Sequence, residues 1–462
     1  MSGALRGHRR WFTNQSEDRW RFREAELTRV GNRSVAVVIL LVSIVIFVVM
    51  GRSLQRNSPQ GLLDFKVLYY GASCLVHHCD PYEVGDLTHF FLKSGGNLPT
   101  DPPIVQHVVT SYVYLPTAFL ITVPFSLLPW GVSHVLWTAL TVFFFGLSAF
   151  LVWAVCPRDA PVMSAVLIGF VVAGSEIVFA GGNAVGFAVS LCAIAAWSFY
   201  REKCAAAGVL FLTISLLLKP QDAGLVWLYF LLAGGSYRKR ALQTLALTAV
   251  LTLGSVLWVT HLVPGWLHEQ RDAFTALSTH GEMDDPGPGS TIDRTPGMVI
   301  DLQAVISIFH NEPSVYDPIA YLMAGLFLLP WSVKTLGSRR SYEDTWLALA
   351  AVSAISMLVA YHKPYDAKLL ILSVPACVML WMSGDRKGRI ALAITAITFI
   401  LSADVPLAII VILSRNTQFG TGIFDKLLRV LVTRPATIAL IVMACFYLWM
   451  FLERTNSRLE AV

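Results

Sequence analysis

The sequence predicts an all-α protein, a polytopic bundle whose helices cross a membrane many times. Of its 462 residues, 55% are hydrophobic and only 14% are charged, whereas a soluble domain carries about 25% charged residues. Mostly apolar runs follow one another along the chain, and most reach the roughly 17–25 residues that a membrane-spanning helix needs. The runs lie at 34–50, 112–128, 131–155, 161–179, 184–200, 205–218, 222–235, 241–263, 317–335, 345–361, 366–384, 389–413 and 436–452.

The segment before the first run sets the expected orientation. Residues 1–33 are polar and contain eight arginines against four acidic residues. Because Lys and Arg are enriched in cytoplasmic segments, we expect 1–33 to lie in the cytoplasm and the run 34–50 to lead outward. The polar stretch 51–111 is then the first outer loop.

Asp64 is the most informative residue of this loop. It opens the stretch Asp-Phe-Lys-Val-Leu-Tyr-Tyr that ends at Tyr70, and Asp-Pro-Tyr follows, ending at Tyr82. A carboxylate beside an aromatic run, just outside the membrane, indicates an active site; the alternative is a plain connecting loop. Cys74 and Cys79 predict a local disulfide or loop packing rather than a metal site, because no second cluster of ligands appears.

The next six runs end at Tyr237–Arg240, whose basic residues predict a cytoplasmic position. An even number of crossings cannot connect opposite sides of a membrane, so we expect one of these runs to be re-entrant or part of a broken helix. The candidate breaks are residues 181–183 (Gly-Gly-Asn) and 219–222 (Lys-Pro-Gln-Asp). About twelve crossings then remain in a transmembrane domain over 34–452, followed by a cytoplasmic tail at 453–462.

Three charged residues interrupt or adjoin apolar runs, where a charge is costly unless it faces protein or a watery cavity. Lys219 either snorkels from a turn between two helices or lines a cavity that binds a headgroup. Glu176 and Asp404 are either proton sites of a transporter or buried acids with a structural role.

The run 241–263 leads outward again, so 264–316 is the second predicted outer loop. It contains eight acidic residues and two arginines, which fits an exterior segment. Its Gly- and Pro-rich part, 281–297, has no regular pattern, and we expect either a loop that closes over a substrate or a disordered insert. Arg294 is the one cation of this part and a candidate contact for phosphate.

The segment Tyr361-His-Lys-Pro-Tyr-Asp-Ala-Lys368 lies at a predicted outer helix boundary. Pro364 suits the first turn of the following helix, whose positive N-terminal end would lie beside His362 and Lys363. Free backbone N–H groups, a helix dipole and a cation together make a phosphate site. The alternative is an anchor at the membrane interface, where Tyr, Lys and His are common.

Signatures of soluble enzymes are absent from the sequence. It has no P-loop, no GxGxxG after a strand, no HExxH and no GxSxG. The basic residues are scattered, and nothing resembles a nucleic-acid-binding module. These absences argue against a cytoplasmic enzyme that uses nucleotides, and the donor substrate of an enzyme would be expected to arrive through the membrane.

The order of these motifs resembles glycosyltransferase family 87 of the GT-C superfamily, a group of mannosyltransferases that use polyprenyl-phosphate mannose. The resemblance covers nearly the whole chain. Leu115-Pro116 and Gly182-Asn183 depart from the Pro-Pro and Gly-Gln that the family often shows. The motifs that carry it are Asp64-Phe65, Tyr69-Tyr70, Asp80-Pro81-Tyr82, Tyr112-Val-Tyr114-Leu-Pro116, Gly181-Gly182-Asn183, Lys219-Pro220-Gln221 and Tyr361-His-Lys-Pro-Tyr-Asp366.

The resemblance implies that Asp64 is the catalytic base of an inverting transfer. A hexose, expected to be mannose, would move from a polyprenyl-phosphate donor to a hydroxyl of a lipid or glycan acceptor, with no metal or further cofactor expected. The site would face the outside of the plasma membrane. A secondary transporter and a non-catalytic lipid-handling protein are the alternatives. The residues expected to bind substrate or its phosphate are His362, Lys363, Arg294, Lys219, Tyr70, Tyr82 and Asp366.

Overall fold

A computed structural model describes the backbone of residues 5–57, 61–96, 109–279, 282, 284–288, 299–338, 340–415 and 419–459. All regular secondary structure within these ranges is helical. The all-α prediction is therefore confirmed for the described part of the chain.

The first half of the chain forms helices of very different length. They are α1 (Leu5–Asn57), α2 (Leu63–Val76), α3 (Val84–Lys93), η1 (Pro116–Ala118), α5 (Phe119–Ser126), α6 (Trp130–Trp153), α7 (Pro161–Ala173), α8 (Glu176–Gly181), α9 (Val185–Arg201), α10 (Ala205–Leu218), α11 (Pro220–Leu232) and α12 (Gly235–Leu262).

The second half continues in the same way. Its helices are α13 (Trp266–Ser278), α14 (Leu302–Phe309), α15 (Pro313–Gly337), α16 (Tyr342–Val359), η3 (Asp366–Ser373), α17 (Val374–Met382), α18 (Arg386–Leu401), α19 (Asp404–Arg415), α20 (Ile423–Thr433) and α21 (Pro435–Leu459).

Six of the described helices are long and apolar enough to cross a membrane, or seven if α18 and α19, bent by 60° at their junction, form one span. This confirms a helical membrane protein, while the number of about twelve crossings stays a prediction. Several predicted runs are divided into shorter helices, which accounts for the lower number. The six are α6, α12, α15 and α16, together with Gly31–Asn57 of α1 and Pro435–Arg454 of α21.

Both suspected breaks coincide with helix ends. Gly182 adopts φ 63° between α8 and α9, a left-handed conformation that glycine adopts without strain. Lys219 separates α10 from α11, and Pro220 opens α11 at a position where its missing N–H costs nothing. Neighbouring predicted runs therefore end in separate short helices on the two sides of each break, and the residues at each break become available to a site.

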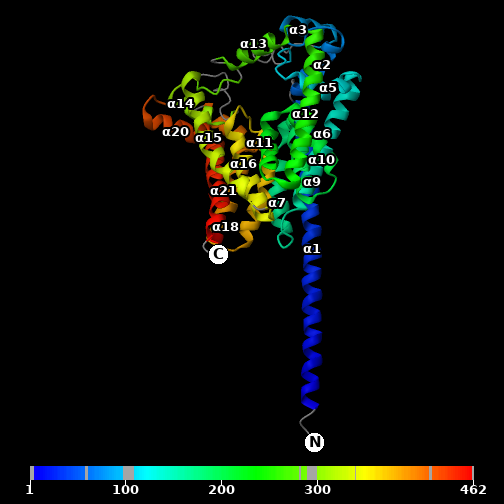
Figure 1. Ribbon diagram of the computed structural model, residues 1–462, viewed down its shortest axis with the longest axis vertical. Helices are drawn as coiled ribbons and strands as arrows, with labels where there is room; N and C mark the ends of the chain where they lie inside the picture. Colours follow the sequence, from blue (N-terminus) through cyan, green and yellow to red (C-terminus); the bar gives the residue numbers. More distant parts are fainter. Residues whose placement is uncertain are drawn as a thin grey trace.

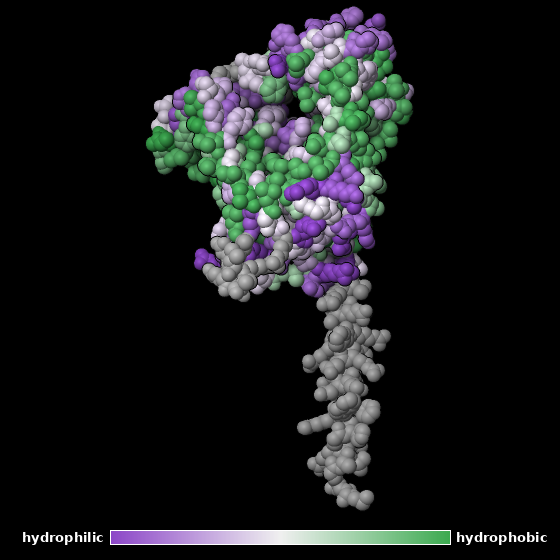
Figure 2. Space-filling model, viewed as in Figure 1, coloured by the Kyte–Doolittle hydropathy of each residue, from purple (hydrophilic) through white to green (hydrophobic). Residues whose placement is uncertain are grey.

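In Figure 1, α21 ends on the side of the bundle from which α1 projects, and α3 and α13 lie at the opposite end. Between them, α1 packs against α7 and α8, and α16 packs against α21 and η3. Helix α16 is enclosed on all sides, with Trp346 fully buried. In Figure 2, hydrophobic residues cover much of the middle of the face shown, and hydrophilic residues gather both at the end with α3 and α13 and at the end from which α1 projects.

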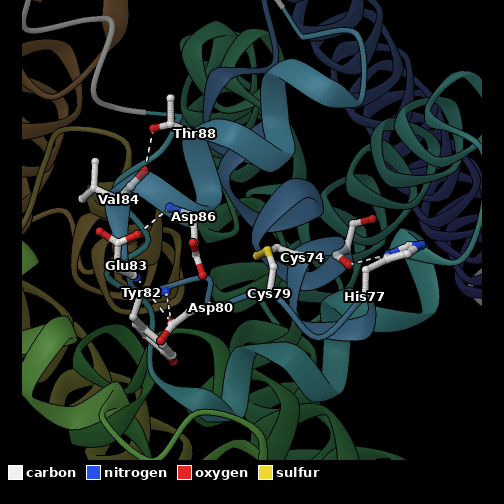
Figure 3. The surroundings of a disulfide bond; sticks show 10 residues. Cys74, His77, Cys79, Asp80, Tyr82, Glu83, Val84, Asp86 and Thr88 are labelled. Carbon is white, nitrogen blue, oxygen red and sulfur yellow. Dashed lines mark hydrogen bonds between the residues drawn. A yellow bond between two sulfur atoms is a disulfide. The ribbon is translucent and has the colours of Figure 1, made fainter.

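The loop after α2 is closed by a disulfide between Cys74 and Cys79, with the Cα atoms 5.0 Å apart (Figure 3). Of the alternatives left open by the sequence, the local disulfide is the one observed. Among the described residues no group of three or more His, Cys, Asp or Glu side chains is arranged to hold a metal ion. Asp80 continues the turn by accepting hydrogen bonds from the backbone N–H groups of Tyr82 and Glu83.

Candidate functional site

A cavity of about 260 Å³ lies beside the start of α2. The first turn of α2, the segment 111–115, the break before α11, the end of α13 and the segment 361–365 form its wall. Its charged residues are Asp64, Lys219, Asp284 and Lys363, its polar residues include Asn183, Tyr114, Tyr361 and Tyr365, and its apolar residues include Leu63, Val67, Leu115, Leu218, Phe274 and Leu277.

Asp64 is held in the first turn of α2 by the Gly-Gly-Asn break. The Nδ2 of Asn183 donates a hydrogen bond of 2.9 Å to Asp64 Oδ2. The backbone N–H of Leu62, just before α2, donates to the carbonyl of Ala180 at 2.7 Å. A Cβ on Gly181 would lie 2.8 Å from Asp64 Oδ2, so only glycine allows this close approach. Two distant segments of the sequence thus fix one carboxylate.

Aromatic packing behind Asp64 reinforces this position. The ring of Phe65 stacks on Trp137 with centroids 4.6 Å apart. The indole N–H of Trp137 donates to the carbonyl of Gly182 at 2.9 Å. The aromatic run therefore anchors the glycine break to α6, and the break in turn holds Asp64.

Burial raises the pKa of Asp64 above its ordinary value. The hydrogen bond from Asn183 and the charges of Lys363 and Lys219 act in the opposite direction, but burial dominates. The carboxylate is consequently a stronger base than an exposed aspartate.

Lys219 forms a buried ion pair with Asp366. Its Nζ lies 2.6 Å from Asp366 Oδ1, and the two side chains are 9% and 2% exposed. The other oxygen, Oδ2, accepts the backbone N–H of Lys363 at 2.7 Å. One carboxylate therefore holds both cation-bearing segments of the cavity wall. Of the two positions considered for Lys219, the cavity-lining one is observed.

Lys363 is paired with Asp284, which the sequence analysis did not single out. Lys363 Nζ lies 3.1 Å from Asp284 Oδ1, and the hydroxyl of Tyr361 donates to the same oxygen at 2.5 Å. The ammonium group also lies 5.4 Å from the centre of the Tyr361 ring, a favourable cation–π distance. Asp284 stands in a Gly- and Pro-rich stretch among other acids, and no local pattern distinguishes it.

His362 lies behind the cavity and does not line it. Its ring is fully enclosed, with Nε2 3.2 Å from Asp222 Oδ1 and Nδ1 2.7 Å from the carbonyl of Ala360. Burial lowers the pKa of His362, but Asp222 outweighs this effect and the net shift is upward. Nδ1 is hydrogen-bonded and Nε2 faces the Asp222 carboxylate, so this histidine supports the segment that carries Lys363.

The two predicted tyrosines also lie outside the cavity wall. The ring of Tyr70 packs edge-on against Phe91 at 4.7 Å. Tyr82 is buried, and its hydroxyl donates to the carbonyl of Tyr114 at 3.1 Å. Tyr82 therefore acts on the site through Tyr114. Arg294 lies outside the described residues.

Glu176 and Asp404 meet in a separate cluster with Lys368. Lys368 Nζ donates to the carbonyl of Gly174 at 2.8 Å and lies 3.6 Å from Asp404 Oδ1. Asp404 Oδ2 accepts the backbone N–H of Ile177 at 2.6 Å. These three residues join α8 and η3 to the start of α19, and none of them lines the cavity.

Asn183 lines the cavity through the break that the sequence indicated, although it was not expected to bind Asp64. A carboxylate with raised basicity and two lysine ammonium groups thus share one partly apolar cavity. Such a set can accept a proton from a hydroxyl and stabilise a phosphate that leaves from the other side of the reacting carbon.

Comparison with known proteins agrees with this arrangement. The model of glycosyltransferase family 87 matches residues 112–362. No curated protein and no solved structure matches the chain. The match covers more than half of the 462 residues and includes Asn183, Lys219 and Asp284, which line the cavity around Asp64. The chain therefore belongs to glycosyltransferase family 87.

Proposed function

We propose that this membrane glycosyltransferase moves a hexose, mannose in the first instance, from a polyprenyl-phosphate donor to a hydroxyl of a lipid or glycan acceptor. Asp64 is the general base, and the configuration at the anomeric carbon is inverted. The observation that carries this proposal is the presence of Asp64, Lys219 and Lys363 in one cavity. The family assignment supports a glycosyltransferase over a secondary transporter.

The proposed role of Asp64 follows from its surroundings. A carboxylate cannot deprotonate a free alcohol outright, because their pKa values are too far apart. It can accept the proton as the new C–O bond forms, which contributes roughly 10²–10⁴-fold to the rate. The raised pKa favours this transfer, and the hydrogen bond from Asn183 orients the carboxylate.

The leaving phosphate gains negative charge as the C–O bond to the sugar breaks. Lys219 and Lys363 are the described cations in the cavity wall, and they would stabilise that charge selectively in the transition state. Asp366 and His362 position them from behind. We propose Arg294 as a further phosphate contact.

The remaining expected residues have supporting roles in this proposal. Tyr70 and Tyr82 pack the first loop against the cavity wall. The apolar residues Phe274 and Leu277 of α13 line the same cavity, which suits a donor whose tail stays in the bilayer.

We propose that the cavity opens on the outer face of the plasma membrane. The basic segment Tyr237–Arg240 lies at the start of α12, and α13, which lines the cavity, follows the other end of that helix (Figure 1). Because basic residues are enriched in the cytoplasm, this polarity supports an extracytoplasmic site.

Transfer of radiolabelled mannose tests the proposal. The full-length protein in lipid nanodiscs would receive labelled polyprenyl-phosphate mannose and a lipid extract. The matched variants are Asp64→Asn and Asp272→Asn; Asp272 is an exposed carboxylate on α13. We expect Asp64→Asn to abolish transfer and Asp272→Asn to retain it. Transfer that survives Asp64→Asn unchanged would contradict the assignment of the base.

The same assay identifies the sugar. Donors with glucose, galactose or arabinose on the same polyprenyl phosphate replace the mannose donor one at a time. Transfer of another sugar in preference to mannose would overturn that part of the proposal and leave Asp64 as the base.

A further inference from the structure

Helix α20 exposes its apolar side and turns its charged side toward the protein. The exposed residues follow the spacing i, i+1, i+4, i+5 and i+8, which forms one stripe along a helix. A helix on a water-facing surface shows the opposite arrangement. The stripe consists of Ile423, Phe424, Leu427, Leu428 and Leu431, which are 67%, 75%, 49%, 40% and 60% exposed.

The charged side of α20 holds the segment next to the cavity. Lys426 Nζ donates to the carbonyl of Phe309 at 2.9 Å. Arg429 donates to the carbonyl of Pro288 at 2.9 Å. Arg434, directly after the helix, donates to the carbonyl of Pro286 at 3.2 Å. Two of these cations thus bind backbone carbonyls of the Gly- and Pro-rich segment, and Lys426 binds the end of α14.

The position of α20 identifies what covers its stripe. A single residue, Arg434, separates α20 from α21, which is long and apolar enough to cross a membrane. Helix α15, which packs against α14 and α21, exposes Leu322, Leu326 and Leu329 at 66–68%, as a lipid-facing span does. In Figure 1, α20 lies beside α14 at the end of these spans, and hydrophobic residues cover the same place in Figure 2.

We propose that α20 lies in the membrane–water interface with its apolar stripe among the lipid acyl chains, and that from there it holds the segment carrying Asp284 against the cavity. Interfacial helices bury their apolar face at the boundary between headgroups and acyl chains. The partner is the lipid leaflet on the cavity side. Pro286 links the two roles, because it accepts hydrogen bonds from Arg434 and Ser307 and stands two residues from Asp284.

Membrane depth is measured with a nitroxide on a single introduced cysteine of the full-length protein in lipid nanodiscs. The exposed Cys204 and Cys445 are first replaced by serine. Phe424→Cys is the test position, Leu326→Cys on α15 the lipid control, and His89→Cys on α3 the water control. Collisions with oxygen report lipid, and collisions with a water-soluble nickel complex report solvent.

We expect the label at 424 to resemble that at 326, with frequent oxygen collisions and few nickel collisions. Nickel collisions as frequent as at 89 would show that water covers the stripe and would overturn the proposal. Protection from both reagents would show that protein covers it, a second copy included, and would also overturn the proposal. No catalytic turnover is needed, so this result is independent of the proposed reaction.

The link to the cavity rests on the proposed function and has its own test. Phe424→Ser with Leu427→Ser weakens the anchoring, and we expect the donor KM to rise several-fold while kcat at saturation is retained. The control is Leu326→Ser with Leu329→Ser, which removes lipid-facing leucines of α15. If the α20 pair leaves the donor KM at the wild-type value, as the α15 control pair is expected to do, α20 does not position the segment that carries Asp284.

Discussion

Replacing Lys219 by methionine separates stability from catalysis at the buried ion pair. The Nζ of Lys219 lies 2.6 Å from Asp366 Oδ1, and the side chains are 9% and 2% exposed. Removing one partner of such a pair leaves a buried charge without compensation, which costs about 3–5 kcal/mol. We therefore expect Lys219→Met to lower the thermal midpoint of unfolding clearly.

The second variant restores stability without restoring the cation. Asp366→Asn removes the stranded charge, and its amide oxygen can still accept the backbone N–H of Lys363, which lies 2.7 Å from Oδ2 in the wild type. The double variant Lys219→Met with Asp366→Asn should regain most of the lost stability. Its transfer rate should stay about 10²–10³-fold below wild type, the usual loss when one group that stabilises a developing negative charge is removed.

Thermal unfolding in detergent and mannose transfer in nanodiscs measure the two effects on the same preparations. Recovery of both stability and transfer in the double variant would refute the reasoning, because Lys219 would then act only as the partner of Asp366. Loss of transfer with stability intact in Lys219→Met would show that the ion pair contributes less than its burial implies.

Further predictions concern Asp64. Because burial raises its pKa, kcat/KM should fall on acidification with a midpoint above 3.8, and a pH–rate profile measures this. Asn183→Ala removes a hydrogen bond that lowers the pKa of Asp64, so the midpoint should move to higher pH. In the same variant kcat should fall about 10–100-fold, because a hydrogen bond to a charged group contributes about 1.5–3 kcal/mol. An unchanged pH–rate profile would exclude a role for Asn183. Gly181→Ala places a Cβ 2.8 Å from Asp64 Oδ2 and should displace the carboxylate. Transfer should slow at least ~10-fold, because a misplacement of a catalytic group by ~1 Å costs up to ~10²-fold in rate. Wild-type rates in this variant would show that Asp64 tolerates the displacement.

The sequence predicts those parts of the site whose residues differ in charge or helix-forming tendency from their immediate neighbours. Asp64 is a carboxylate beside an aromatic run just outside the membrane, Lys219 is a charge next to an apolar run, and the glycines before Asn183 separate two runs. Lys219 and the glycine break stand out because a charge or a helix break at membrane depth needs a reason. The structure places Asp64, Lys219 and Asn183 in the wall of one cavity.

Other parts depend on contacts between distant segments. Asp284 pairs with Lys363, whereas its neighbour Asp285 accepts the N–H of Gly287 within its own turn. Nothing in the local sequence distinguishes these two acids. The same limit applies to His362, whose ring points to Asp222 on α11 and not into the cavity. The number of membrane crossings also depends on contacts between distant segments, because the helices packed around a short apolar helix decide whether it crosses the membrane or re-enters it.

The two carboxylate oxygens of Asp366 accept hydrogen bonds from different segments. One accepts from the side chain of Lys219, before α11, and the other from the backbone N–H of Lys363, after α16. The side chain of Lys219 and the backbone of Lys363 are therefore tied to one carboxylate before any substrate arrives. If the segments of Lys219 and Lys363 stay in place, the cavity widens for entry or release where α13 contributes Phe274 and Leu277 to its wall. Substrate exchange would then be a motion of α13 against the part of the wall that carries the two lysines.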